Sequence, residues 1–153
     1  MSGFVATAAL PPAGDMLIND GWFPDVSLES VRDIVRIDGT VTPARLRDVI
    51  RHAVIHVNCQ LAGFKARHAA AATLASVQGD EIDGVMRLEL LYMRAVAHLA
   101  KAELIERYRD LDSTGSGLRR AIDMEPSIDE HRRNARWAVR DILGEPRSVV
   151  ELI

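Results

Sequence analysis

Cysteine, lysine and aromatic residues are scarce in this sequence. Its 153 residues include one cysteine, Cys59, and aromatic side chains make up 5% of the chain. Because one thiol cannot close an internal disulfide, we expect a reducing compartment. With so few aromatic rings, the core has to be built from Leu, Ile, Val and Ala. Small side chains let helices approach closely, which favours a helical packing.

The sequence also lacks a positive net charge and a long apolar run. Its formal net charge is -3, whereas a DNA-binding domain is usually basic. No apolar stretch comes near the roughly 20 residues that a membrane-spanning helix needs, and no signal-peptide pattern opens the chain. Hydrophobic residues make up 48% and charged residues 27% of the chain, as in a globular domain. We therefore predict a globular protein without membrane contact.

Turn residues and composition separate a helical domain from two extended segments. Residues 1–24 contain Pro11-Pro12, and we expect them to form an extended N-terminal arm. Residues 25–144 form the expected helical domain, and residues 145–153 a β-prone C-terminal tail. The predicted fold is all-α: a small helical bundle with long antiparallel helices, flanked by the arm and the tail.

Capping signals indicate where the helices of this domain begin and end. A serine or threonine just before a helix can accept a hydrogen bond from its first free amides, and proline is tolerated at the first helical position. A glycine just past the last turn is a common stop. The predicted helices are residues 28–37 after Ser27, residues 43–68 after Thr42, residues 82–110, and residues 128–143 after a Ser127–Glu130 capping box and before Gly144.

The predicted helix over residues 82–110 is apolar on two opposite sides. A helix with two apolar faces has to be buried on both of them. Either it lies at the centre of the bundle, or a neighbouring copy covers its second face. The two stripes consist of Leu88, Leu91, Tyr92, Ala95, Leu99 and Ala102, and of Met86, Leu90, Met93, Ala97, Leu104 and Tyr108.

Arginine side chains follow one face of the last predicted helix. Arg132, Arg136 and Arg140 recur at helical spacing, with Arg133 close by and Trp137 beyond them. Guanidinium groups suit bidentate contacts at interfaces better than ammonium groups do. The face either contacts an acidic partner surface or DNA phosphates, or it is solvated, with Arg133 stacked on Trp137. For the three spaced arginines we predict a protein partner before DNA.

Large apolar side chains in the arm and tail are further candidate contacts. Trp22 and Phe23 are too large to leave bare on a loop, so they either attach the arm to the core or touch a partner. The tail can add as a strand to a sheet edge in another subunit, or fold back along a groove of its own domain. Its candidate contact residues are Val149, Val150, Leu152 and Ile153.

Two patterns resemble metal sites, and neither is complete. His52, His56 and Cys59 lie on one side of a helix at i, i+4 and i+7, but no second cysteine can complete a zinc site. Residues 110–115 place oxygen donors as in a calcium loop, yet Ala121 stands where the bidentate glutamate belongs. The sequence has no nucleophile motif and no distinctive carboxylate pair. We expect no metal, no cofactor and no enzymatic activity.

Three stretches cover most of the chain after Phe23. They read RIDGTVTPARL at residues 36–46; YMRAV, AKAEL and ERYRD within residues 92–110; and RR, ARWAVRDILG and VELI within residues 132–153. None of them is a chemical motif, so the specificity lies in finding all three in this order. Together they resemble the head completion (GPL) family of temperate contractile-tailed phages.

The resemblance implies a structural role late in head assembly. It implies a head completion or head–tail connector protein that binds the portal vertex after DNA packaging, stabilises the filled head and prepares it for tail attachment. The implied partners are the portal protein, the tail terminator or other neck proteins, and further copies of the chain in a dodecameric ring through which the packaged DNA passes. The implied location is the head–tail vertex of the virion, assembled in the bacterial host cytoplasm.

Three other functions stay open at the level of sequence. A DNA-binding regulatory or packaging-associated helical protein would need two short helices joined by a tight turn. A small metal-dependent enzyme would have to use His52, His56 and Cys59. A plain helical scaffold or tail-assembly factor differs from a connector only in its location in the virion.

Overall fold

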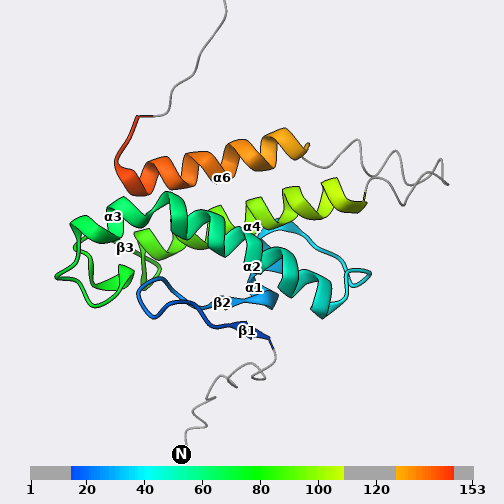
Figure 1. Ribbon diagram of the computed structural model, residues 1–153, viewed down its shortest axis with the longest axis horizontal. Coiled ribbons are helices and arrows are strands. Elements are labelled where there is room, and N and C mark those ends of the chain that lie inside the picture. Colours follow the sequence, from blue (N-terminus) through cyan, green and yellow to red (C-terminus); the bar gives the residue numbers. More distant parts are fainter. Residues whose placement is uncertain (1–14, 109–126, 147–153) are drawn as a thin grey trace, which may run out of the picture.

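The computed structural model describes residues 15–108 and 127–146, in which helices pack around one long helix (Figure 1). In chain order the elements are β1 (Met16–Leu17), β2 (Val26–Ser27), α1 (Leu28–Val35), α2 (Pro43–Gln60), α3 (Ala62–Arg67), the 3-10 helix η1 (Leu74–Ser76), β3 (Glu81–Ile82), β4 (Val85–Met86), α4 (Arg87–Tyr108) and α6 (Ile128–Leu143).

Side-chain caps begin three of the helices where the sequence predicts them. Ser27 and Thr42 each accept a hydrogen bond from the amide three residues ahead, at 3.2 and 3.4 Å. At the start of α6 the Glu130 amide donates to the Ser127 hydroxyl at 3.2 Å, and the Ser127 amide donates to the Glu130 carboxylate at 2.7 Å. Gly144 ends α6 in the left-handed conformation, with φ of 72°. The predicted caps are thus confirmed.

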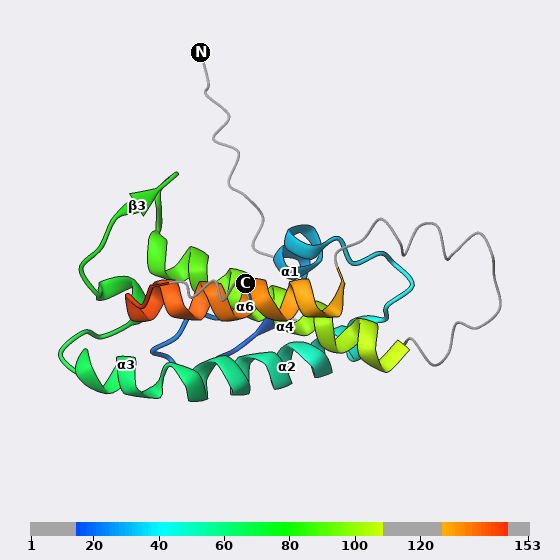
Figure 2. The same ribbon diagram turned by 90° about the horizontal axis from the view of Figure 1, so that it is seen from above.

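α4 is the central helix of the described part of the chain. It contacts α1, α2 and α6, and α2 and α6 both run antiparallel to it (Figures 1 and 2). Five of its side chains have no exposed surface: Tyr92, Ala95, Val96, Ala97 and Ala100. The run of alanines lets neighbouring helices approach closely. Burial inside the chain therefore explains most of the double apolar pattern of this helix.

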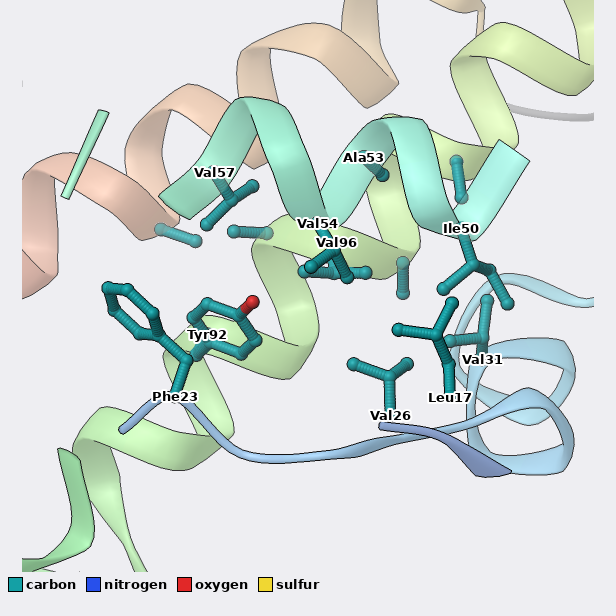
Figure 3. Packing of buried hydrophobic residues seen from close by; sticks show 14 of the residues in the cluster. Leu17, Phe23, Val26, Val31, Ile50, Ala53, Val54, Val57, Tyr92 and Val96 are labelled. Carbon is teal, nitrogen blue, oxygen red and sulfur yellow. The ribbon is translucent and has the colours of Figure 1, made fainter. Parts of the chain in front are cut away.

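One apolar core joins these helices to the segment that precedes α1. Figure 3 shows Leu17 and Val26 facing Val31 of α1 and Ile50 of α2, while Phe23 lies beside Tyr92 of α4. Val26 and Val31 have no exposed surface. Burial of such side chains stabilises the fold by roughly 25 cal/mol for each Å² of apolar surface removed from water. Residues of the predicted arm thus take part in the core.

The all-α prediction is wrong, because two small antiparallel sheets accompany the helices. In the first, Met16 pairs with Ser27 and Leu17 with Val26. The second is a hairpin, in which Glu81 pairs with Met86 and Ile82 with Val85. The fold of the described residues is therefore mixed, with helices dominant and two two-stranded sheets at their edges.

The hairpin also shortens the predicted helix over residues 82–110, since α4 begins at Arg87. Its turn residues Asp83 and Gly84 both have positive φ, 54° and 74°. A two-residue turn of this kind matches the twist of a hairpin, and Asp-Gly is among its preferred sequences. Gly84 is thus a turn residue of the hairpin, although the predicted helix over residues 82–110 includes it.

The predicted helix over residues 43–68 is divided at Leu61. The Leu61 amide donates to the carbonyls of both Val57 and Cys59, and the chain continues as α3. Leu61 has no exposed surface. Beyond it Phe64 lies edge-on to Trp22, with ring centroids 6.5 Å apart. The division lets α3 close over the segment that precedes α1.

Candidate interaction surfaces

The arginine face of α6 borders the helix surface that packs on α4. The buried side chains of α6 are His131, Ala135, Ala138, Val139 and Ile142. Their spacing places them along one stripe, as expected for an amphipathic helix. The arginines of α6 flank this stripe and keep more of their surface in solvent. The helix thus presents a mostly apolar face to α4 and a cationic face outward.

Several of these arginines already have acidic partners within the chain. Arg132 forms an ion pair with Glu106 of α4 at 2.6 Å. Arg140 lies 3.6 Å from Glu145, just past the end of α6. Both pairs are partly exposed, and such pairs contribute about 0–1 kcal/mol. The arginine face is therefore partly neutralised by the chain itself.

Arg133 and Arg136 differ in their surroundings. The Arg133 guanidinium lies 5.0 Å from the centroid of the Trp137 ring, as in the alternative in which this part of the helix is solvated. It also lies 3.7 Å from Glu130. Arg136 is exposed and has no hydrogen bond or ion pair with any residue of the described ranges. Of the three spaced arginines, Arg136 is the one whose charge is most available to a partner.

Trp22 and Phe23 lie in the core. They are 8% and 3% exposed, which leaves little surface for a partner. The Trp22 indole donates to the Ala71 carbonyl at 3.0 Å, and the Phe23 ring stacks on Tyr92 with centroids 5.2 Å apart. The structure therefore corresponds to the alternative in which both side chains attach the arm to the helices.

Asp20 holds the chain in place just before these two rings. Its carboxylate accepts hydrogen bonds from the amides of Trp22 and Phe23, both at 3.0 Å, and from the Lys65 ammonium at 2.7 Å. Burial raises the pKa of Asp20, but these donors outweigh it and the pKa is lowered. An ionised carboxylate thus fixes the turn that directs the rings inward.

A polar network lies beneath this turn and was not anticipated from the sequence. Asn19 donates to the Tyr92 hydroxyl at 2.8 Å, Tyr92 donates to Asn58 at 2.6 Å, and Asn58 donates back to Asn19 at 2.9 Å. Burial raises the pKa of the Tyr92 phenol far above its ordinary value. The closed ring of three side chains joins the first segment to α2 and α4.

A histidine pair lies between α4 and α6 and was likewise missed. The Nδ1 atoms of His98 and His131 are 2.8 Å apart, and His131 is 3% exposed. Burial, together with the neighbouring charges of His131 and Arg94, lowers the pKa of His98 to about 4. Helical spacing places both residues near the buried stripes, but sequence alone did not show that the two stripes meet there.

His52, His56 and Cys59 line an open groove on α2, together with Ile55 and, from α4, Leu99 and Glu103. Cys59 is exposed. Within residues 15–108 and 127–146, no group of three metal-ligating side chains comes close enough to hold an ion.

Two sets of candidate residues lie outside the described residues. They are the calcium-like pattern at residues 110–115 and the tail residues Val149, Val150, Leu152 and Ile153. None of the helices searched in the described part is long and apolar enough to cross a membrane.

Helices dominate the described residues, and no group of three metal-ligating side chains lies among them, so the arrangement is typical of a structural protein. A sequence model of the phage head completion protein (GPL) family matches residues 17–153. The chain is 40% identical over 152 residues to the head completion/stabilization protein of Escherichia phage P2, covering 96% of this chain and 90% of that protein. No solved structure matches it. The chain belongs to the phage head completion protein (GPL) family, a family of structural virion proteins.

Proposed function

We propose that this chain is a head–tail connector subunit that binds the portal vertex after DNA packaging and prepares the filled head for the tail. The observation that carries the proposal is the family match over residues 17–153, which includes every described helix. The proposed partners are the portal protein, the tail terminator or other neck proteins, and further copies in a dodecameric ring around the DNA path. The proposed location is the head–tail vertex of the virion.

The arginine face of α6 is the proposed contact for one of these partners. Arg136 is exposed, and Arg132 and Arg140 have ion pairs with side chains that stay partly in solvent. An acidic partner surface can displace such weak pairs at small cost. Val149, Val150, Leu152 and Ile153 are proposed as a second contact, made by the tail.

A sequence-reading DNA-binding role has less support. A helix-turn-helix joins its two helices by a turn of about 3–4 residues. The connection from α1 to α2 spans residues 36–42, and Arg32 holds it by donating to the carbonyls of Asp38 and Val41, each at 2.6 Å. The two helices are therefore fixed in a different arrangement.

Cryo-electron microscopy of the virion vertex tests the proposal. We expect a ring of this chain between portal and tail, with α6 directed toward a protein neighbour. A matched specimen from phage lacking the chain should show no density at that position. A vertex without density that fits the α2–α4–α6 arrangement would contradict the connector role.

A further inference from the structure

Helix α6 is attached to the rest of the described chain mainly through α4. It lies along α4 in both views (Figures 1 and 2), and its contacts with the other described elements are few. The side chains that α6 buries are His131, Ala135, Ala138, Val139 and Ile142. The larger buried side chains, among them the aromatic rings, come from the segment before α1 and from α1 to α4. Most of the core therefore does not depend on α6.

The contact between α4 and α6 contains a polar pair whose geometry restricts its protonation. The Nδ1 atoms of His98 and His131 face each other at 2.8 Å, and the ring centroids are 5.1 Å apart. One Nδ1 therefore has to carry a hydrogen, and the other has to accept it. His131 is 3% exposed and His98 is partly buried, so the pair lies largely away from water. Two neutral rings satisfy this contact, whereas two protonated rings cannot.

A proton weakens the contact at either of the nitrogen atoms that can bind it. On the accepting Nδ1 it removes the hydrogen bond and sets two N–H groups against each other. On the Nε2 atom of the donating ring it keeps the hydrogen bond but leaves an imidazolium in a buried interface, which costs free energy. Burial and the neighbouring charges of His131 and Arg94 lower the pKa of His98 to about 4.

Positive charges on α4 oppose the uptake of a proton by the pair. Arg94 lies about one turn before His98 and contributes to the lowering of its pKa. Lys101 lies about one turn after His98 and is 9% exposed. It donates to the Arg36 carbonyl at the C-terminal end of α1 at 3.2 Å. The surroundings of the pair on the α4 and α1 side are therefore cationic.

The neighbouring acidic group on α6 already has other partners. The charge of Glu130 acts on His131, but its carboxylate accepts from the Ser127 amide at 2.7 Å and lies 3.7 Å from Arg133. These contacts direct the carboxylate to the N-terminal cap of α6 rather than to the imidazole pair.

We infer that the histidine pair makes the α4–α6 contact an acid-sensitive switch, in which protonation releases α6 from α4 while the rest of the described fold stays in place. A single helix of 16 residues has little stability in water on its own, so released α6 also loses its helical structure. The chain thus has two parts of different acid stability, α6 and the core around α1, α2 and α4. The switch acts within one copy and goes beyond the proposed connector function.

The two tryptophans of the chain report on these two parts separately. Trp137 lies in α6, where its ring stacks with Arg133. Trp22 lies in the core and donates to the Ala71 carbonyl. The stabilising contribution of the pair is complete above about pH 6.5 and is lost as the pH falls toward 4. Release of α6 should therefore alter the surroundings of Trp137 within this window and leave those of Trp22 unchanged.

Fluorine NMR of the full chain labelled with fluorotryptophan, recorded during an acid titration, tests the switch. The variant Trp137→Phe assigns the two resonances. We expect a range of pH in which Trp137 gives the signal of an unfolded chain while Trp22 keeps its native signal. A titration in which both resonances change together, at one and the same pH, would overturn the inference.

A double variant tests whether the histidine pair is responsible. His98→Leu combined with His131→Leu removes both titrating rings together, so neither ring is left facing an apolar partner. We expect this variant to lose the intermediate range, with both tryptophans changing together. The matched control, His52→Gln combined with His56→Gln, removes two exposed histidines of α2 and should keep the intermediate range. Loss of that range in the control, or its persistence in the first variant, would contradict the role of the pair.

Glu106→Gln separates the histidine pair from the ion pair between Glu106 and Arg132, which also joins α4 to α6. That ion pair is partly exposed and contributes about 0–1 kcal/mol, so at neutral pH the variant should keep the native Trp137 signal. Release of α6 by this substitution alone would show that the carboxylate, rather than the imidazole pair, holds the contact.

Discussion

Tyr92 combines complete burial with a hydroxyl that both donates and accepts. It accepts from Asn19 and donates to Asn58, so removal of the oxygen leaves two partly buried amide groups short of a partner. A buried polar group without a partner costs about 1–3 kcal/mol. We expect Tyr92→Phe to lower the free energy of unfolding by about that amount, measured by urea denaturation with an unchanged slope.

A double-mutant cycle with Asn58→Ala separates this network from simple loss of packing. The two substitutions should be clearly non-additive, because each removes a part of the same closed ring. Additive effects would show that the three side chains act independently.

His98 makes the stability of the chain depend on pH. Its pKa of about 4 in the folded chain lies below the ordinary value of 6.5, so the unfolded chain binds a proton first as the pH falls. This contribution to stability is complete above about pH 6.5 and is lost as the pH falls toward 4. We expect the urea midpoint to decrease as the pH falls across this window. His98→Gln should make the midpoint depend less steeply on pH.

The exposed His52 supplies the matched control for that titration. Because His52→Gln leaves the buried pair intact, the pH dependence that His98 causes should remain. Equal effects of the two substitutions would contradict the role of the buried pair.

Among the elements, the β3–β4 hairpin depends on a glycine for the conformation of its turn. Gly84 has φ of 74°, where a Cβ is strained by roughly 1–2 kcal/mol even though no neighbouring atom lies within 4 Å. Gly84→Ala should therefore lower the free energy of unfolding by about 1 kcal/mol, read from chemical denaturation. Gly39→Ala is the control, since Gly39 also has open space but no positive φ. Equal destabilisation by both would contradict a role for backbone strain.

Capping residues made the helix ends predictable from the sequence. The tertiary contacts between distant segments could not be predicted in this way. Ser27, Thr42 and Ser127 act on amides only three residues away, so the local sequence suffices to place them. Phe64, just after the division at Leu61, contacts Trp22, which is distant in the sequence. The Asp83-Gly84 hairpin had a local signal, but the apolar periodicity that follows it led to a helix prediction beginning too early.

At the scale of the whole molecule, Arg136 offers the clearest separation of binding from stability. Its side chain is exposed and has no partner among residues 15–108 and 127–146, so Arg136→Ala should leave the unfolding midpoint unchanged. We expect the same substitution to lower incorporation of the chain into filled heads several-fold, measured by quantitative mass spectrometry of purified particles.

The matched control is Arg133→Ala, which removes a neighbouring charge that already stacks on Trp137. It should preserve incorporation. Normal incorporation of the Arg136 variant would show that the arginine face makes no contact that matters for assembly.

The candidate contact residues could likewise be predicted where they lie close together in the sequence, and not where the fold brings distant segments together. Helical spacing alone placed the α6 arginines on one face, and the structure keeps them there. Met16, Val85 and Met93 come together from β1, the hairpin and α4, segments far apart in the sequence, so no spacing rule could predict that they share a surface. The aromatic pair Trp22-Phe23 was recognisable as important, while its inward direction follows from Asp20 and Lys65.

The central position of α4 has a consequence for how the chain matures during synthesis. α1 and α2 precede α4, but α6, which covers its remaining face, leaves the ribosome last among the described helices. Until then the face of α4 around His98, which contacts His131 of α6, stays open to other nascent chains, and exposed apolar surface promotes aggregation. A ribosome that stalls before residue 127 therefore releases a product in which α4 lacks the cover of α6. We expect such truncated chains to aggregate.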